Sequence, residues 1–246
     1  IESQKNGKSQ ITLSAGNTGA LFILSRLILN MIDGVEKPAL AGLWPNKIGM
    51  NVVLDLGANI ECNDKNLIDF SYMGAALHKA LYPEIVPKIA LLNVGLEEIK
   101  GSEIIKKAYQ HLKGTNKIDF TFHGYIEGNH MMDGNVNVIV TDGFTGNIAL
   151  KTAEGTANFI TKSLKEDLSK NLLNKISLLL SYSALKKFKN RLDPRKYNGA
   201  ILLGLNGPVV KSHGSTDAKG LAYSINMCNK IVKGNLIEKI KRNLSN

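Results

Sequence analysis

The sequence predicts an α/β fold, a three-layer α/β/α sandwich in which helices cover both faces of a mostly parallel sheet. Three observations predict it. Short apolar runs alternate with longer segments of helical period along most of the 246 residues. Most runs end in a glycine-containing loop that leads into a helix, which is typical of parallel strands joined by crossover helices. The composition, 43% hydrophobic and 21% charged, is that of a globular chain and not of a disordered one.

The N-terminal half of the chain supplies three strand-and-helix units. Each strand is a short apolar run, and the three are predicted at 11–13, 50–56 and 88–94. A segment with apolar residues at helical spacing follows each run, and these helices are predicted at about 20–30, 64–81 and 102–112. Asn63 or Asp64 caps the second helix, because both side chains accept hydrogen bonds from the free N–H groups of a helix start.

The C-terminal half continues the alternation. Two further strands are predicted at 118–122 and 136–141, and the second leads through a glycine-containing loop into a long helix. Apolar runs return at 200–203 and 208–211, and a final helix ends the chain. We therefore expect a single α/β domain over 1–246, with its ligand site at the carboxyl ends of the strands.

One segment, 162–196, combines charge with an apolar stripe. It contains ten basic and three acidic residues, and so carries +7 of the net charge of +10. Leucine and isoleucine recur in it at i, i+4 spacing, which predicts a basic amphipathic helical hairpin. Two interpretations stay open: a charged face packed on its own protein or a second subunit, or an interfacial anchor on anionic lipid. The residues proposed for contact with a membrane or with an acidic partner protein are Leu172, Ile176, Leu179, Leu180, Lys186 and Lys187.

Other patterns are missing from the sequence. Cys62 and Cys228 are far apart and no Cys/His cluster has metal-ligand spacing, so we expect reduced thiols and no metal site. The most apolar stretch, 20–29, is interrupted by an arginine and is too short to cross a bilayer. The chain starts at Ile1 without a Met, and we expect part of the natural N-terminus to be missing.

Four loops that follow predicted strands are rich in glycine and polar residues. They lie at 16–19, 55–59, 142–147 and 211–215. Glycine lets the backbone turn tightly, and the free N–H groups of a helix start attract an anion. One such loop is weak evidence, but four in one chain favour a site for an anionic small molecule. We expect the four loops to gather at one edge of the sheet.

The anion is expected to be phosphate without a nucleotide. The sequence contains no Gly-x-Gly-x-x-Gly fingerprint and no Gly-x4-Gly-Lys-Ser/Thr loop, so the common dinucleotide and nucleotide sites are not indicated. Gly-x-Ser-x-Gly is also absent, so the sequence does not indicate the usual serine nucleophile either.

A series of motifs in a fixed order indicates a family. The motifs lie at 14–20, 54–59, 127–128, 142–147, 151–155, 198–200 and 211–218. Together they resemble the PlsX family of bacterial phosphate acyltransferases over nearly the whole chain. Two departures matter. Members of the family begin with a further strand and loop, and their Gly-Glu-Glu-Glu loop reads Gly-Leu-Glu-Glu here, with Leu96 in place of the first acid.

The resemblance implies a fold related to isocitrate dehydrogenase and phosphotransacetylase, a homodimer, and no metal or organic cofactor. It implies that acyl-acyl carrier protein and inorganic phosphate form acyl phosphate for phospholipid biosynthesis, with a glycerol-3-phosphate acyltransferase as a candidate downstream partner. For the hairpin at 162–196 it implies peripheral, reversible attachment of a cytoplasmic protein to the inner face of the cytoplasmic membrane. It also implies that Lys100 and Asn147 hold phosphate and the reacting acyl group.

The loops and the resemblance together suggest roles for individual residues. The catalytic candidates are Lys100, Asn147 and His213. The phosphate-binding candidates are Gly16, Asn17, Thr18, Gly19, Gly143, Thr145, Gly146, Lys211 and Ser215. We expect a phosphate oxygen to attack the thioester carbonyl directly, without an acyl-enzyme, while a preorganised donor stabilises the oxyanion. His213 is a candidate to protonate the leaving thiol.

Three alternatives stay open. A phosphotransacetylase that uses coenzyme A shares the fold, the acyl group and phosphate. A dehydrogenase of related fold would need acidic metal ligands and a nucleotide loop, which the sequence does not show. A non-catalytic module that binds nucleic acid would interleave aromatic and basic residues for base stacking, yet 162–196 contains only Tyr182 and Phe188, and we expect no nucleic acid partner.

Overall fold

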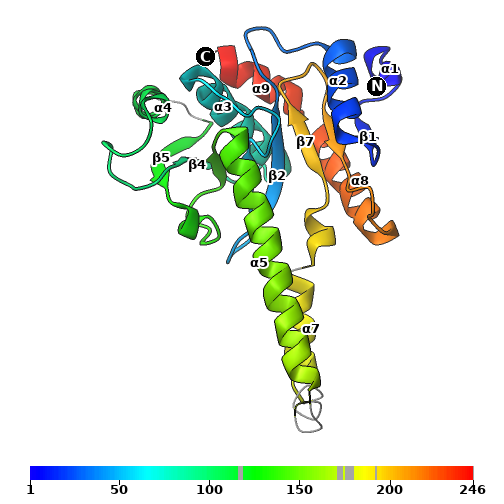
Figure 1. Ribbon diagram of the computed structural model, residues 1–246. Helices are drawn as coiled ribbons and strands as arrows, with labels where there is room; N and C mark the ends of the chain where they lie inside the picture. Colours follow the sequence, from blue (N-terminus) through cyan, green and yellow to red (C-terminus); the bar gives the residue numbers. More distant parts are fainter. Residues whose placement is uncertain (116–118, 171–173, 175–179, 192, 246) are drawn as a thin grey trace.

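The computed structural model describes residues 1–115, 119–170, 174, 180–191 and 193–245. The centre of the fold is an eight-stranded sheet (Figure 1). The strands lie in the order β1-β8-β7-β2-β3-β6-β4-β5. Their bounds are β1 Thr12–Ser14, β2 Ala39–Pro45, β3 Met50–Leu54, β4 Lys88–Leu92, β5 Thr121–Ile126, β6 Val138–Val140, β7 Ala200–Leu203 and β8 Val209–Lys211.

Helices cover both faces of this sheet (Figure 1). Helices α3, α4, α8 and α9 pack on one face, and α2 and α5 pack on the other. The helix bounds are α1 Glu2–Lys5, α2 Thr18–Leu29, α3 Asp64–Leu81, α4 Glu103–Lys113, α5 Gly143–Ser169, α7 Tyr182–Arg191, α8 Ala218–Lys233 and α9 Leu236–Ser245, with 3-10 helices η1 Gly128–His130 and η2 Pro194–Tyr197. The predicted three-layer α/β fold is confirmed.

Alternate residues of each central strand enter different layers of the core. In β3, Val52 and Leu54 pack in the layer that includes α3, whereas Val53 packs on the opposite face with Leu150 and Ala153 of α5. All three β3 side chains are fully buried. This alternation follows from the two-residue period of a strand. Burial of each such side chain contributes about 1.5–3 kcal/mol, so packing on both faces fixes the position of β3.

The sheet contains two parallel blocks that run in opposite directions. Strands β3, β6, β4 and β5 form one block, and β1 and β8 form the other. Between them, β7 and β2 are antiparallel to both of their neighbours. The carboxyl ends of the two blocks therefore lie at opposite edges of the sheet. We call these the β3–β6 edge, with the loops 55–59, 93–101 and 142–147, and the β1–β8 edge, with the loops 15–19 and 212–217.

Most predicted strands are confirmed to within a few residues, with two differences. The sequence prediction omits β2, because Gly42 and Pro45 interrupt its apolar run and both residue types weaken a strand pattern. Strand β2 nevertheless lies near the middle of the sheet, paired with β7 and β3. The strand predicted at 118–122 is observed as β5, which begins at Thr121; residue 118 lies outside the described residues.

Polar caps explain where the helices begin. Asn63 and Asn66 form a reciprocal capping box at the start of α3, which confirms Asn63 as the cap. A side-chain oxygen also accepts a first-turn N–H at the starts of α2, α4, α5 and α8, from Asn17, Ser102, Asp142 and Asp217. Each cap contributes about 1 kcal/mol of stability. Several loops that were expected to bind an anion are therefore also helix caps.

Helix α5 has 27 residues and extends well beyond the sheet, and α7 lies at the same end of the molecule (Figure 1). We call the described residues of 154–191 the arm. Leu180 is 82% exposed, and Lys186 and Lys187 are exposed as well. Outside the described residues lie three of the predicted contact residues, Leu172, Ile176 and Leu179. The pairing of the arm helices as a hairpin stays a prediction.

Candidate active site

Two of the four glycine-containing loops meet at the β1–β8 edge. The strands that precede them are paired in parallel, with Ser14 opposite Lys211. The N–H of Ser212 donates to the carbonyl oxygen of Ser14 at 2.9 Å. A Cβ placed on Gly214 would lie 3.4 Å from the carbonyl oxygen of Ala15. The two loops are therefore neighbours, as the sequence predicts for this pair.

The start of α2 has open hydrogen-bond donors. Asn17 caps the helix with a neutral side chain, whose Oδ1 accepts from the N–H of Ala20 at 3.0 Å. Within the described part of the chain, the N–H groups of Thr18 and Gly19 have no hydrogen-bond partner, and both residues are exposed. The partial positive charge of the helix end thus faces solvent, and Lys211 adds a full charge at the same edge. This combination suits phosphate.

His213 and Ser215 form the second polar feature of this edge. The N–H and the hydroxyl of Ser215 both contact Nδ1 of His213, at 3.3 and 2.9 Å. Because a backbone N–H can only donate, Nδ1 is the acceptor, and the proton of the neutral imidazole lies on Nε2. His213 is exposed. Its Nε2–H is therefore a donor that a substrate can reach.

Asn198 holds the His213 loop in place, a role that the sequence analysis does not assign to it. Its Nδ2 donates to the hydroxyls of Ser212 and Thr216, each at 2.9 Å, and its Oδ1 accepts from the N–H of His213 at 2.8 Å. The fully buried Ser224 of α8 donates to the carbonyl of Asn198 at 2.9 Å. The sequence carries this signal only as an Asn-Gly pair before β7, and the fold shows which loop the pair supports.

At the β3–β6 edge, the carboxylate of Asp55 fills the loop that follows β3. Asp55 is fully buried. Its oxygens accept from the N–H groups of Leu40, Gly57, Ala58 and Asn59 and from Nδ2 of Asn59, at 2.8 to 3.2 Å. Burial raises the pKa of Asp55, and these hydrogen bonds oppose the rise. The donors of this loop are therefore taken by the carboxylate of the protein itself.

The start of α5 is closed in the same way. The carboxylate of Asp142 accepts from the N–H and the hydroxyl of Thr145, both at 2.8 Å. The N–H of Gly143 donates to the carbonyl of Asn59 at 2.8 Å, and the N–H of Gly146 donates to the carbonyl of Asp142 at 3.0 Å. In this structure these donors are therefore used within the protein, and the role of Gly143, Thr145 and Gly146 in phosphate binding stays a prediction. Both glycines are buried, which reflects the close approach of α5 to the Asp55 loop.

Lys100 and Asn147 also lie at the β3–β6 edge. Nδ2 of Asn147 donates to the carbonyl of Leu56 at 3.2 Å, and the residue is half-buried. Lys100 is exposed in the loop after β4, and its carbonyl accepts from Nδ2 of Asn93 at 3.2 Å. Asn93 is 7% exposed, so a buried amide fixes the turn that presents Lys100. Gly101 permits this turn with a φ of +91°.

A cleft of about 480 Å³ opens beside the start of α5, with Ile60, Cys62, Leu67 and Ile104 among its mainly apolar walls. Burial raises the pKa of the Cys62 thiol to about 11. The pKa of Cys228 is also raised to about 11 by burial. Both thiols are therefore protonated near neutral pH, and neither is an activated nucleophile.

The predicted site residues thus form two groups within one chain. Gly16 to Gly19, Lys211, His213 and Ser215 lie at the β1–β8 edge, whereas Lys100 and the residues from Gly143 to Asn147 lie at the β3–β6 edge. The expectation that all four loops gather at one edge is wrong for a single chain, because β7 and β2 reverse the strand direction between the blocks. In the described ranges, no group of three or more His, Cys, Asp or Glu residues is placed to hold a metal ion.

The sequence and the fold both resemble known proteins. A family model described as fatty acid synthesis protein matches residues 1–239. A phosphate acyltransferase of Pelagibacter ubique is 64% identical over 244 residues, which cover 99% of this chain and 73% of the relative. A phosphate acyltransferase of Caulobacter vibrioides is 46% identical and is matched over 99% and 68% of the two chains. The solved EutD phosphotransacetylase of Staphylococcus aureus shares the fold, with a TM-score of 0.61 at 15% identity over 95% of this chain and 65% of that protein.

Proposed function

The chain belongs to the fatty acid synthesis protein family, whose relatives described above are phosphate acyltransferases, and we propose that its acyl donor is the thioester of an acyl carrier protein. Transfer of an acyl group to phosphate, in the synthesis of fatty acids and phospholipids, is the activity of the family.

The open start of α2 is the observation that carries this proposal. Phosphate is a compact dianion or monoanion near neutral pH, and it needs N–H donors and positive charge without a competing carboxylate. The N–H groups of Thr18 and Gly19 supply the donors, and Lys211 and the hydroxyl of Ser215 lie at the same edge. By contrast, at the start of α5 the N–H of Gly143 donates to the carbonyl of Asn59, and the carboxylate of Asp142 adds negative charge beside the helix start.

The reaction needs positioning more than a strong base. An oxygen of hydrogen phosphate attacks the thioester carbonyl, a C–O bond forms, and the C–S bond breaks. The phosphate proton passes to the departing sulfur, so that acyl phosphate and a free thiol result. His213 can relay this proton, because its Nε2–H is a donor and its Nδ1 is hydrogen-bonded to Ser215. Lys100 or Asn147 stabilises the oxyanion if either residue reaches the carbonyl.

A homodimer provides a way for the two groups of residues to meet. Within one chain they lie at opposite edges of the sheet, so a second copy can place its Lys100 and Asn147 beside the His213 loop. Large apolar side chains on α5 support a partner surface, because Phe144 is 60% and Phe159 71% exposed. Mixing Lys100→Ala and His213→Ala chains tests this arrangement. If each site takes Lys100 from one chain and His213 from the other, the mixture regains up to about a quarter of the wild-type activity. If each site is built within one chain, the mixture regains none.

The arm is proposed to contact acyl carrier protein and the inner membrane surface. It combines exposed cations such as Lys186 and Lys187 with exposed Leu180 and Phe188. Carrier proteins and the cytoplasmic leaflet are both acidic, so the same charges favour both contacts. Within the described residues, no helix is long and apolar enough to cross a membrane. Flotation with anionic vesicles tests the membrane contact. We expect the double variant Leu180→Glu, Phe188→Glu to lose flotation, and unchanged flotation would refute the proposed contact.

One assay tests the proposed donor. The protein is incubated with acyl-acyl carrier protein and orthophosphate, and hydroxylamine traps any acyl phosphate that forms. We expect phosphate-dependent release of the carrier thiol and no covalent acyl adduct on the protein. The second candidate donor is acyl-coenzyme A, as in the phosphotransacetylase alternative that the sequence leaves open. Faster turnover with coenzyme A than with the carrier thioester would replace the proposed donor by this one.

A further inference from the structure

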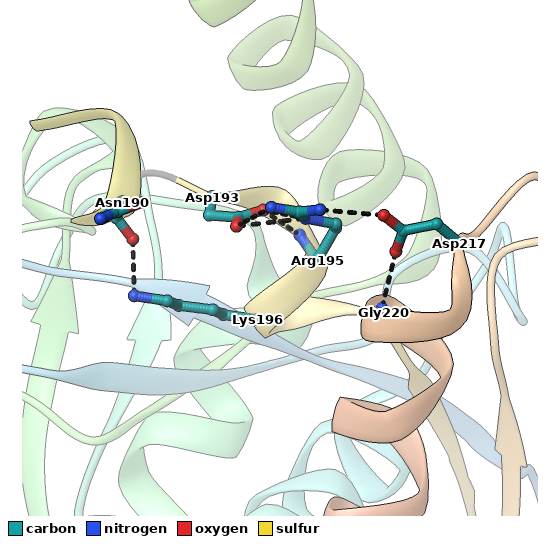
Figure 2. Close-up of polar contacts among 6 residues, drawn as sticks. All are labelled: Asn190, Asp193, Arg195, Lys196, Asp217 and Gly220. Atoms are coloured by element: carbon teal, nitrogen blue, oxygen red, sulfur yellow. Dashed lines mark hydrogen bonds and ion pairs between the residues drawn. The ribbon is translucent and has the colours of Figure 1, made fainter. Parts of the chain in front are cut away.

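Arg195 lies in the turn between α7 and β7 and ties this turn to the β1–β8 edge. The guanidinium contacts both carboxylate oxygens of Asp193, from Nε at 2.9 and 3.1 Å and from an Nη at 2.7 Å. Its other Nη donates to the carboxylate of Asp217 at 2.9 Å (Figure 2). Arg195 thus bridges the turn at η2 and the start of α8.

Asp193 is a nearly buried anion, and Arg195 keeps it charged. The residue is 7% exposed. Hydrogen bonds from Arg195 lower the pKa of Asp193 to about 2. Next to this pair, Lys196 donates to the carbonyl of Asn190 in α7 at 2.5 Å (Figure 2). The turn at η2 is therefore joined to α7 by Lys196, in a contact that does not involve Arg195.

The same turn holds both ends of the His213 loop. At one end, Asn198 bonds the N–H of His213 and the hydroxyl of Ser212, as described above. At the other end, Asp217 accepts from Arg195 with one oxygen and from the N–H of Gly220 with the other, at 2.8 Å. The loop from 212 to 217 is thus held at its two ends by the side chains of Asn198 and Arg195, which lie three residues apart in the chain.

We propose that Arg195 is a positioning residue, which holds the His213 loop in its phosphate-binding shape through Asp217. The inference rests on the proposed function, because it assumes that this loop binds phosphate. Arg195 itself does not touch phosphate. Exposed ion pairs contribute little to stability, about 0–1 kcal/mol each. We therefore expect loss of the Asp217 contact to alter the conformation of the loop while it changes the free energy of unfolding only a little.

The test compares Arg195→Gln, Asp217→Asn and the double variant in the full chain. Asn is a good helix cap, so Asp217→Asn keeps an acceptor for the N–H of Gly220 while it removes the charge. Arg242→Gln is the matched control, because Arg242 makes an ion pair with Asp119 at 2.8 Å away from the loop. Calorimetric titration with orthophosphate alone measures affinity, and thermal unfolding measures stability.

We expect each single variant to weaken orthophosphate binding about tenfold, which corresponds to ~1.4 kcal/mol, and the double variant to add no more than about twofold. Arg195→Lys keeps the positive charge and should therefore recover part of the lost affinity. The recovery should be incomplete, because one ammonium cannot bridge both carboxylates. The inference would be overturned if Arg195→Gln bound orthophosphate as tightly as Arg242→Gln does. It would also be overturned if the losses of affinity in the two single variants multiplied in the double variant. A parent protein that binds orthophosphate but forms no acyl phosphate would refute the proposed function instead.

Discussion

The loops that lead into α2 and α5, at the two edges of the sheet, use the same local pattern, a strand, a glycine-containing loop and a capped helix, with different electrostatic results. At the start of α2, on the β1–β8 edge, the cap is the neutral Asn17 and two N–H groups stay open. The carboxylate of Asp217, which caps α8 at the same edge, is paired with Arg195. At the β3–β6 edge the caps and loop fillers are the carboxylates of Asp142 and Asp55. We therefore expect the identity of one or two polar residues, and not the number of glycines, to decide whether such a loop can receive an anion.

The glycines differ between the edges for the same reason. A Cβ on Gly146 would lie 1.9 Å from the carbonyl oxygen of Asp55, so this glycine allows α5 to pack against the loop. A Cβ on Gly19 would meet only the side chain of its own cap, Asn17, at 3.4 Å. One edge therefore uses glycine for helix packing, whereas the other keeps it beside open donors.

The largest effect is expected from Asp55→Ala at the β3–β6 edge. Several buried N–H groups lose their acceptor, and each unsatisfied group costs ~1–3 kcal/mol, so we expect a loss of about 4 kcal/mol in the free energy of unfolding. Asn17→Ala at the other edge removes a single cap and should cost about 1 kcal/mol. Urea unfolding at pH 7 measures both. Equal losses would show that the two loops are held in the same way.

The free energy of unfolding should also depend on pH, through a buried histidine in the helix that packs on β3 and β6. His78 lies in α3, which packs on β3 and β6, and it is 1% exposed. Burial lowers its pKa to about 4 from the ordinary 6.5. Below pH 6.5 the unfolded chain takes up a proton that the folded chain excludes, so stability falls as the pH drops toward 4, by up to about 3 kcal/mol.

His78→Leu isolates this contribution. Urea unfolding at pH 7, 5.5 and 4 should show a smaller decline for the variant than for the parent. If the two declines coincide, another group causes the acid sensitivity.

Exchange of the cap charges sharpens the comparison further. Asn17→Asp still caps α2, but it places a carboxylate where phosphate is proposed to bind, and we expect orthophosphate affinity to fall about tenfold, or ~1.4 kcal/mol. Asp142→Asn keeps the cap of α5 and should leave the affinity within about twofold. Calorimetry with orthophosphate measures both. The opposite ranking would move the phosphate site to the β3–β6 edge.

The smallest effect is expected from Cys62→Ser. The thiol lines the cleft at the β3–β6 edge, and its pKa of about 11 leaves it protonated. We therefore expect turnover to stay within about twofold and no acyl group to be trapped on the parent protein. Mass spectrometry of the parent after incubation with donor provides the check, and an acyl adduct on Cys62 that disappears in the variant would contradict direct transfer.

Much of the fold could be predicted from the sequence, because period and glycine punctuation act locally. The predicted run at 200–203 coincides with β7, and the cap at Asn63 is observed. The resemblance carried the family assignment, and the comparisons confirm it. Strand β2 was missed because its glycine and proline hide an apolar run that becomes central only through its neighbours.

The grouping of the site could not be predicted, because strand direction is a property of the whole sheet. The loops of Gly16 and Gly143 look alike in sequence, yet the two antiparallel strands between the blocks send them to opposite edges. The role of Asn198 depends on a contact with a loop that lies 14 residues further along the chain. The bridge made by Arg195 likewise depends on Asp217, which lies 22 residues away.

A structure of the protein with bound orthophosphate at neutral pH tests the central comparison most directly. We predict phosphate at the start of α2, on the N–H groups of Thr18 and Gly19 and within reach of Lys211. Phosphate at the start of α5, with Asp142 displaced and α2 empty, would contradict the account.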